Sequence, residues 1–209
     1  MSGERKIYQE FIQAYPQMKK QPVQEALDLL WISCRSGGKI LVCGNGGSAA
    51  DAEHIVGELM KGFRLKRPLS EGEKEAFGAV KDGKKLADAL QKGIPAISLN
   101  SHTALLTAVG NDTAYRMVFA QQVYGYGKKG DILIAMSTSG RSVNVLEAAK
   151  TARVMEMKVI GITGETFSEL GEYSDICFRL PARETYQVQE YTLPLYHALC
   201  AMLEERMFG

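Results

Sequence analysis

The sequence predicts an α/β protein in which helices cover both faces of a doubly wound parallel sheet. Short apolar runs alternate with longer segments of helical periodicity, and two of these runs end in glycine-rich or serine-rich turns. Strands that alternate with helices pair in parallel, because each helix returns the chain to the same edge of the sheet. A length of 209 residues suits one domain with one site better than two.

Two helices are expected in the N-terminal segment, residues 1–36. Apolar side chains recur there at helical spacing from Ile7 to Trp31. The segment is expected to divide between Pro16 and Pro22, because a proline inside a helix loses a hydrogen bond and clashes with the preceding turn.

Five strands and their helices should follow in alternation. Strands are expected at residues 39–43, 94–99, 131–136, 158–162 and 175–180. Helices are expected at residues 49–61, from 101 onward, at 142–155, near 167, and as a long final helix at 184–207. Ligands of such sheets bind beyond the carboxyl ends of the strands, which is where the glycine and serine turns lie.

Residues 64–93 interrupt this rhythm. The stretch is highly charged and has only weak helical periodicity, around residues 86–90. We expect an inserted arm or flap, and a solvated surface loop with one short helix is an equal alternative.

The composition excludes several classes of protein. Lys plus Arg number 25 against 24 for Asp plus Glu, so the net charge of +1 offers no general field for nucleic acid or an anionic membrane. The charged N-terminus is unlike a signal peptide, and no apolar run approaches the roughly 18 residues of a membrane span. The four cysteines show neither zinc-knot spacing nor the density of a secreted scaffold, so free thiols and a cytoplasmic location are expected.

A phosphate site is predicted at residues 137–142, read Ser-Thr-Ser-Gly-Arg-Ser. Hydroxyls and backbone N–H groups meet there at the positive end of a helix. An ordinary helix N-cap is the alternative.

The earlier turn, residues 44–48, lacks both the G-x-G-x-x-G and the G-K-[ST] patterns, which argues against NAD and ATP. The alternative interpretation of residues 44–48 is a tight turn that binds no ligand.

The histidines suggest a metal site. His54 and Glu58 lie four residues apart and share one face of a predicted helix. Gln189 and His197 lie about two turns apart on the final helix. Two nitrogens, a carboxylate and an amide oxygen would suit Zn²⁺ or another divalent transition metal. Each residue alone is more often an ordinary polar group, and spacing does not bring the two pairs together.

Five motifs resemble one family. They are GNGGSAADAEHIVGELM at 44–60, AVGND at 108–112, AMSTSGRS at 135–142, VIGITG at 159–164 and VQEYTLPLYH at 188–197. In this order they resemble the sedoheptulose 7-phosphate isomerases, or phosphoheptose isomerases, of the sugar isomerase (SIS) fold. The resemblance implies one SIS domain over residues 1–209, a sugar-phosphate substrate and metal-assisted enediolate chemistry. It also implies a homotetramer whose active sites are shared between subunits. In that family the segment corresponding to residues 64–93 is much shorter. The resemblance therefore does not fix the length of the sugar that this chain would bind.

The resemblance also implies roles for individual residues. The implied catalytic residues are Glu58 and His197. The implied metal ligands are His54, Glu58, Gln189 and His197. The implied substrate-binding residues are Asn45, Gly46, Gly47, Glu58, Asn111, Asp112, Ser137, Thr138, Ser139, Ser142 and Gln189.

Two other functions stay open. The first is a non-catalytic SIS-domain binding protein that touches a replication initiator or senses a sugar phosphate. Such relatives tend to lose the metal and acid–base residues, whereas Glu58 and His197 are both present here. The second is an isomerase or etherase acting on another sugar phosphate.

Overall fold

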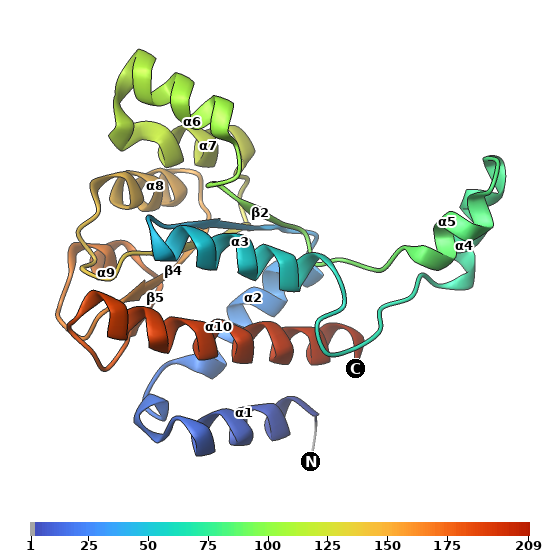
Figure 1. Ribbon diagram of the computed structural model, residues 1–209, viewed down its shortest axis with the longest axis horizontal. Coiled ribbons are helices and arrows are strands. Elements are labelled where there is room, and N and C mark those ends of the chain that lie inside the picture. Colours follow the sequence, from blue (N-terminus) through green and yellow to red (C-terminus); the bar gives the residue numbers. More distant parts are fainter. Residues whose placement is uncertain (1–2) are drawn as a thin grey trace.

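The computed structural model describes residues 3–209; residues 1 and 2, the start of the predicted segment 1–36, lie outside the described part. It confirms the expected α/β fold with one parallel sheet (Figure 1). The strands are β1 (Ile40–Cys43), β2 (Ala96–Ser98), β3 (Ile132–Met136), β4 (Lys158–Thr163) and β5 (Ile176–Arg179). Their order is β2-β1-β3-β4-β5, so the winding direction reverses between β1 and β3.

Helices cover both faces of the sheet (Figure 1). The first face, here called the α10 face, is covered by α2 (Val23–Arg35), α3 (Gly47–Met60) and α10 (Thr185–Phe208). Helix α1 (Gly3–Ala14) packs on the outer side of α10 (Figure 1). The opposite face, the α8 face, is covered by α6 (Thr103–Val109), α7 (Val118–Tyr126), α8 (Val143–Val154) and α9 (Glu169–Tyr173). A 3₁₀ turn at Pro16–Met18 separates α1 from α2, where the prolines predicted a division.

The central strands are apolar throughout because both faces are buried. In β3, Ile132, Ile134 and Met136 join the core under the α10 face. Leu133 and Ala135 point the other way and join the core under the α8 face. This alternation explains why the strand is a continuous apolar run, as expected for a parallel sheet covered on both sides.

Some elements differ from the sequence-based expectation. The helical segment expected from residue 101 is broken into α6, a π-helical turn at Gly110–Ala114, a 3₁₀ turn at Tyr115–Met117, and α7. No proline marks these breaks, so the local sequence gave no signal for them. The long final helix is confirmed as α10, which contains Pro194 within its length. Within residues 3–209, no helix has the length and apolar character that would let it cross a bilayer.

Residues 64–93 form a helical hairpin that stands clear of the rest of the molecule (Figure 1). It contains α4 (Glu71–Ala76), a 3₁₀ turn at Phe77–Ala79 and α5 (Gly83–Ala89). Ser70 and Glu73 form a capping box at the start of α4, which satisfies backbone N–H groups that the short helix cannot pair internally. We call this segment the arm.

A buried ion pair fixes the base of the arm to α10. The side chains of Arg67 and Glu204 are both fully buried, and Arg67 Nε donates to Glu204 Oε1 over 2.7 Å. The Glu204 carboxylate also accepts the backbone N–H groups of Phe63, Arg64 and Leu65 at 2.8, 2.7 and 3.0 Å. Burial alone would raise the pKa of Glu204, but these donors hold it below its ordinary value.

We predict that Glu204→Ala lowers the free energy of unfolding by about 3–5 kcal/mol, because it leaves a buried guanidinium without its partner. Urea denaturation measures the change. Glu190→Ala, an exposed position on the same helix, should change stability by less than about 0.5 kcal/mol.

The difference in free energy of unfolding between wild type and Glu204→Ala should become smaller at acidic pH. A carboxylate whose folded-state pKa is lowered contributes stability above its ordinary pKa, and that contribution is lost as the pH falls through the folded-state value. A Glu204→Ala chain as stable as wild type at neutral pH would show that the pair does not hold the arm.

Candidate active site

A polar pocket of about 350 Å³ lies beyond the carboxyl ends of β1 and β3. The residues that line it are Asn45, Gly46, Gly47, Ser48, Met136, Ser137, Thr138, Ser142, Thr185 and Gln189. Three helices begin at this pocket: α3 at Gly47, α8 after its N-cap Ser142, and α10 at Thr185. Helix N-termini carry partial positive charge and free N–H groups, so the pocket can hold an anion although no Lys or Arg lines it.

The loops around the pocket are locked to each other. Asn45 and Asn144 exchange two side-chain hydrogen bonds of 2.8 and 2.9 Å, which join the turn after β1 to the start of α8. Ser137 Oγ donates to Ser142 Oγ over 2.9 Å across the second turn. Gly46 has φ +57° and ψ −121°, a backbone conformation that only glycine adopts without strain. These contacts hold the pocket wall in one shape.

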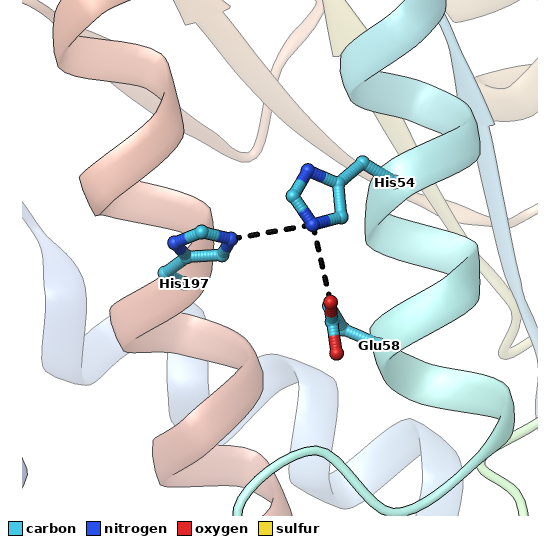
Figure 2. Close-up of side chains that lie close together, drawn as sticks. All are labelled: His54, Glu58 and His197. Carbon is cyan, nitrogen blue, oxygen red and sulfur yellow. Dashed lines mark hydrogen bonds and ion pairs between the residues drawn. The ribbon is translucent and has the colours of Figure 1, made fainter.

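Two helices bring His54, Glu58 and His197 together (Figure 2). His54 and Glu58 come from α3, and His197 comes from α10. His54 Nε2 lies 3.1 Å from Glu58 Oε1 and 3.5 Å from His197 Nε2. One potential ligand atom from each residue lies within 4.8 Å of the others. We call these three residues the His/Glu/His cluster.

The cluster fits a divalent transition metal. Tetrahedral bonds of about 2.0–2.1 Å separate neighbouring ligand atoms by roughly 3.3 Å, close to the two separations above. Two imidazole nitrogens and one carboxylate are donors that zinc and its neighbours favour. The cluster is therefore a candidate three-residue metal site, and a tetrahedral ion bound there would take one further ligand.

The electrostatics of the cluster favour neutral imidazole at His197. Burial lowers the pKa of His197, and the neighbouring His54 lowers it further, while the Glu58 carboxylate opposes both. Glu58 also pairs with Lys61 Nζ at 3.3 Å on the solvent side. A neutral imidazole is the form that binds a metal or accepts a proton.

Some residues that the family resemblance implied lie apart from the cluster within one chain. Gln189 lines the polar pocket and lies so close to Gly47 that a Cβ added there would be 2.5 Å from its amide nitrogen. Among residues 3–209, Gln189 makes no hydrogen bond to the cluster. Asn111 and Asp112 are exposed on the π-helical turn after α6 and do not line the pocket. Ser139 is also exposed, and its Oγ accepts the Arg141 N–H over 3.3 Å.

Several residues at the site were not found from the sequence. Asn144 supports the pocket and Thr185 lines it, while Tyr196 contacts His54 and Asp51 contacts Tyr196. Tyr196 immediately precedes His197, but nothing in the local pattern indicated which way its hydroxyl points. These contacts depend on how α3 and α10 pack, which the sequence pattern does not describe.

Comparisons with known proteins agree with this geometry. The SIS domain family model matches residues 6–75 and 80–164. The phosphoheptose isomerase of Burkholderia pseudomallei is 38% identical over 187 residues, covering 90% of this chain and 83% of that protein. The structure of a phosphoheptose isomerase from Francisella tularensis aligns with a TM-score of 0.75 and 32% identity, covering 97% of this chain and 98% of the other. That of Neisseria gonorrhoeae aligns with a TM-score of 0.73 and 31% identity, covering 96% and 92%.

The fold and the matched residues define an SIS-domain protein. The relatives narrow this further: the chain belongs to the phosphoheptose isomerase family, a family of aldose–ketose isomerases.

We predict that, in metal-free protein, His197 titrates below its ordinary pKa and that two substitutions shift this pKa in opposite directions. Glu58→Gln should lower it further, because the carboxylate stabilises the imidazolium; His54→Gln should raise it, because a like charge is removed. NMR titration of the imidazole signals measures both. Shifts of the same sign would contradict the electrostatic account.

Proposed function

We propose that this protein is a phosphosugar isomerase that interconverts sedoheptulose 7-phosphate and D-glycero-D-manno-heptose 7-phosphate. The observation that carries the proposal is that α3 and α10 each contribute both to an anion-binding pocket and to the His/Glu/His cluster. Such a pair of sites would bind one molecule with a phosphate at one end and a reactive carbonyl at the other.

The spacing along α3 supports a long sugar. Gly47 lines the pocket and His54 belongs to the cluster, seven residues later, which corresponds to a rise of about 10 Å. An extended chain of seven carbons with a terminal phosphate covers a similar distance at about 1.2 Å per bond. A three- or four-carbon sugar phosphate would not reach both ends.

The reaction would be divided between Glu58 and His197. Isomerisation moves a proton between C1 and C2 through an enediolate, so it needs a base at carbon and a proton donor at oxygen. We assign the first role to Glu58 and the second to His197, whose neutral form can exchange a proton with the sugar oxygens. The pocket would hold the phosphate and orient the reacting carbons.

His54, Glu58 and His197 would hold a divalent metal, with Zn²⁺ the best match to the donors. When bound, the metal supplies positive charge beside the carbonyl and enediolate oxygens. A carboxylate bound to a metal is a weaker base, so Glu58 would loosen one contact during turnover.

We further propose a homotetramer with shared active sites. Within one chain, three implied site residues lie apart from the cluster: Asn111, Asp112 and Gln189. In a tetramer, a second copy would bring such residues to the active site of the first. Residues 1–209 would form one cytoplasmic SIS domain, with the arm as an insertion. The net charge of +1 gives no reason to expect a nucleic-acid or membrane partner.

A non-catalytic sugar-phosphate binding protein is the second candidate, because the pocket alone would suffice for it. An isomerase of a different sugar phosphate is the third. Turnover with a panel of sugar phosphates, with added Zn²⁺ and after chelation, separates all three.

Glu58→Gln should lower kcat by at least 10²-fold while the protein stays folded, because the base is lost. Conversion of sedoheptulose 7-phosphate measures turnover, and circular dichroism checks the fold. Glu53→Gln, on the exposed side of α3, is the matched control and should keep wild-type turnover. If Glu58→Gln keeps most of its activity, the assignment of the base is wrong.

Ser142→Ala should raise KM by roughly tenfold or more with little change in kcat, because a hydrogen bond to a charged group is worth about 1.5–3 kcal/mol. Ser142 lines the pocket, and its side chain forms no capping bond to α8, so the helix should be kept. The variant also removes the acceptor of the Ser137 hydroxyl, so thermal unfolding checks that the turn is preserved. Ser36→Ala, exposed at the end of α2, is the control. An effect on kcat alone would place Ser142 in the chemical step instead of in binding.

A further inference from the structure

Tyr196 connects the His/Glu/His cluster to a buried part of the protein. Its side chain is only 2% exposed, and its hydroxyl oxygen lies 2.8 Å from His54 Nδ1 and 3.3 Å from Asp51 Oδ1. The rings of His54 and Tyr196 meet edge to face, with centroids 5.4 Å apart. Asp51 precedes His54 by three residues on α3, so both lie on the side of that helix that faces Tyr196.

Two proton arrangements are compatible with these distances. In the first, His54 Nδ1–H donates to the Tyr196 oxygen and the Tyr196 hydroxyl donates to Asp51. In the second, the hydroxyl donates to His54 Nδ1, the proton of His54 sits on Nε2, and Asp51 receives no hydrogen bond from Tyr196. A phenol has one proton to donate, so Asp51 and His54 Nδ1 compete for it.

The first arrangement gives Asp51, the Tyr196 hydroxyl and His54 Nδ1 a partner each. It leaves no proton between His54 Nε2 and Glu58 Oε1, which lie 3.1 Å apart, so it is the arrangement expected when a metal cation binds between them. A carboxylate is the stronger acceptor, and a hydrogen bond to a charged group is worth more than one between neutral groups. With the proton on Nδ1, the lone pair of His54 Nε2 is free, and this nitrogen is the one that faces Glu58 and His197 (Figure 2).

We propose that Asp51 and Tyr196 are positioning residues that hold His54 as the Nδ1–H tautomer, with Nε2 free to bind a metal. The proposal rests on the proposed metal site and goes beyond it, because neither residue is a ligand. Metal-binding histidines commonly donate their other N–H to a carboxylate or another acceptor, and loss of that acceptor typically weakens metal binding 10–100-fold. Here the Asp51 carboxylate acts on the His54 imidazole through the Tyr196 hydroxyl, which lies between them.

The test is Tyr196→Phe, which keeps the buried ring and removes only the hydroxyl. The affinity of the full-length chain for Zn²⁺, measured by competition with a chromophoric chelator, should fall 10–100-fold. Asp51→Asn should cause a smaller loss, because an amide oxygen can still accept the phenol proton. Tyr191→Phe is the matched control, because Tyr191 lies on the same helix, is partly buried in the same core, and its hydroxyl forms no hydrogen bond among residues 3–209.

A second readout is independent of affinity. In ¹H–¹⁵N spectra of the Zn²⁺-loaded protein, His54 should carry its proton on Nδ1, and Tyr196→Phe should shift that signal. Thermal unfolding of each variant verifies that the fold is kept.

The outcomes separate the two levels of the hypothesis. If wild type and Tyr196→Phe bind Zn²⁺ equally well, or if the bound form protonates Nε2 of His54, the role of Tyr196 is refuted while the metal site stands. If wild type and Tyr191→Phe bind no Zn²⁺, the proposed metal site fails and this inference fails with it.

Discussion

The packing of α3 along α10 is the contact on which the candidate site depends. The two helices run in the same direction, so Gly47 meets Gln189 at one end and His54 meets His197 further along. Beyond these, Glu204 of α10 accepts the N–H groups of the chain that leaves α3. One helix pair thus provides one side of the pocket wall, the His/Glu/His cluster and the anchor of the arm.

The Arg67–Glu204 pair holds the end of α3, close to Glu58. Besides pairing with Glu204, Arg67 donates to the backbone carbonyl of Leu59 over 2.8 Å and to that of Glu58 over 3.4 Å. These carbonyls lie in the last turn of the helix, where no intrahelical donor remains for them. A cation at this end also complements the helix dipole. The backbone that carries Glu58 is therefore held by buried, charged contacts.

Several features could be read from the sequence because they depend on local patterns. The apolar runs at residues 131–136 and 158–162 gave β3 and β4 nearly to the residue, since buried parallel strands need no polar alternation. The His54 and Glu58 pair on one helix face followed from helical spacing. The pattern could not reveal the break between α6 and α7, because weak local preferences there are decided by packing. The start of α4 in the arm did carry a local signal, the Ser70–Glu73 spacing of a capping box, which hydrophobic periodicity does not detect.

The sequence by itself determined the fold class, the position of the glycine and serine turns at the strand ends, and the types of side chain that could bind phosphate and metal. Only the tertiary structure decided that His197 joins His54 and Glu58 while Gln189 turns toward the pocket, and that the Tyr196 hydroxyl lies between His54 and Asp51. The reason is geometric: spacing fixes which residues share a face of one helix, but contacts between helices depend on their relative rotation and height, which the packing of the whole core sets.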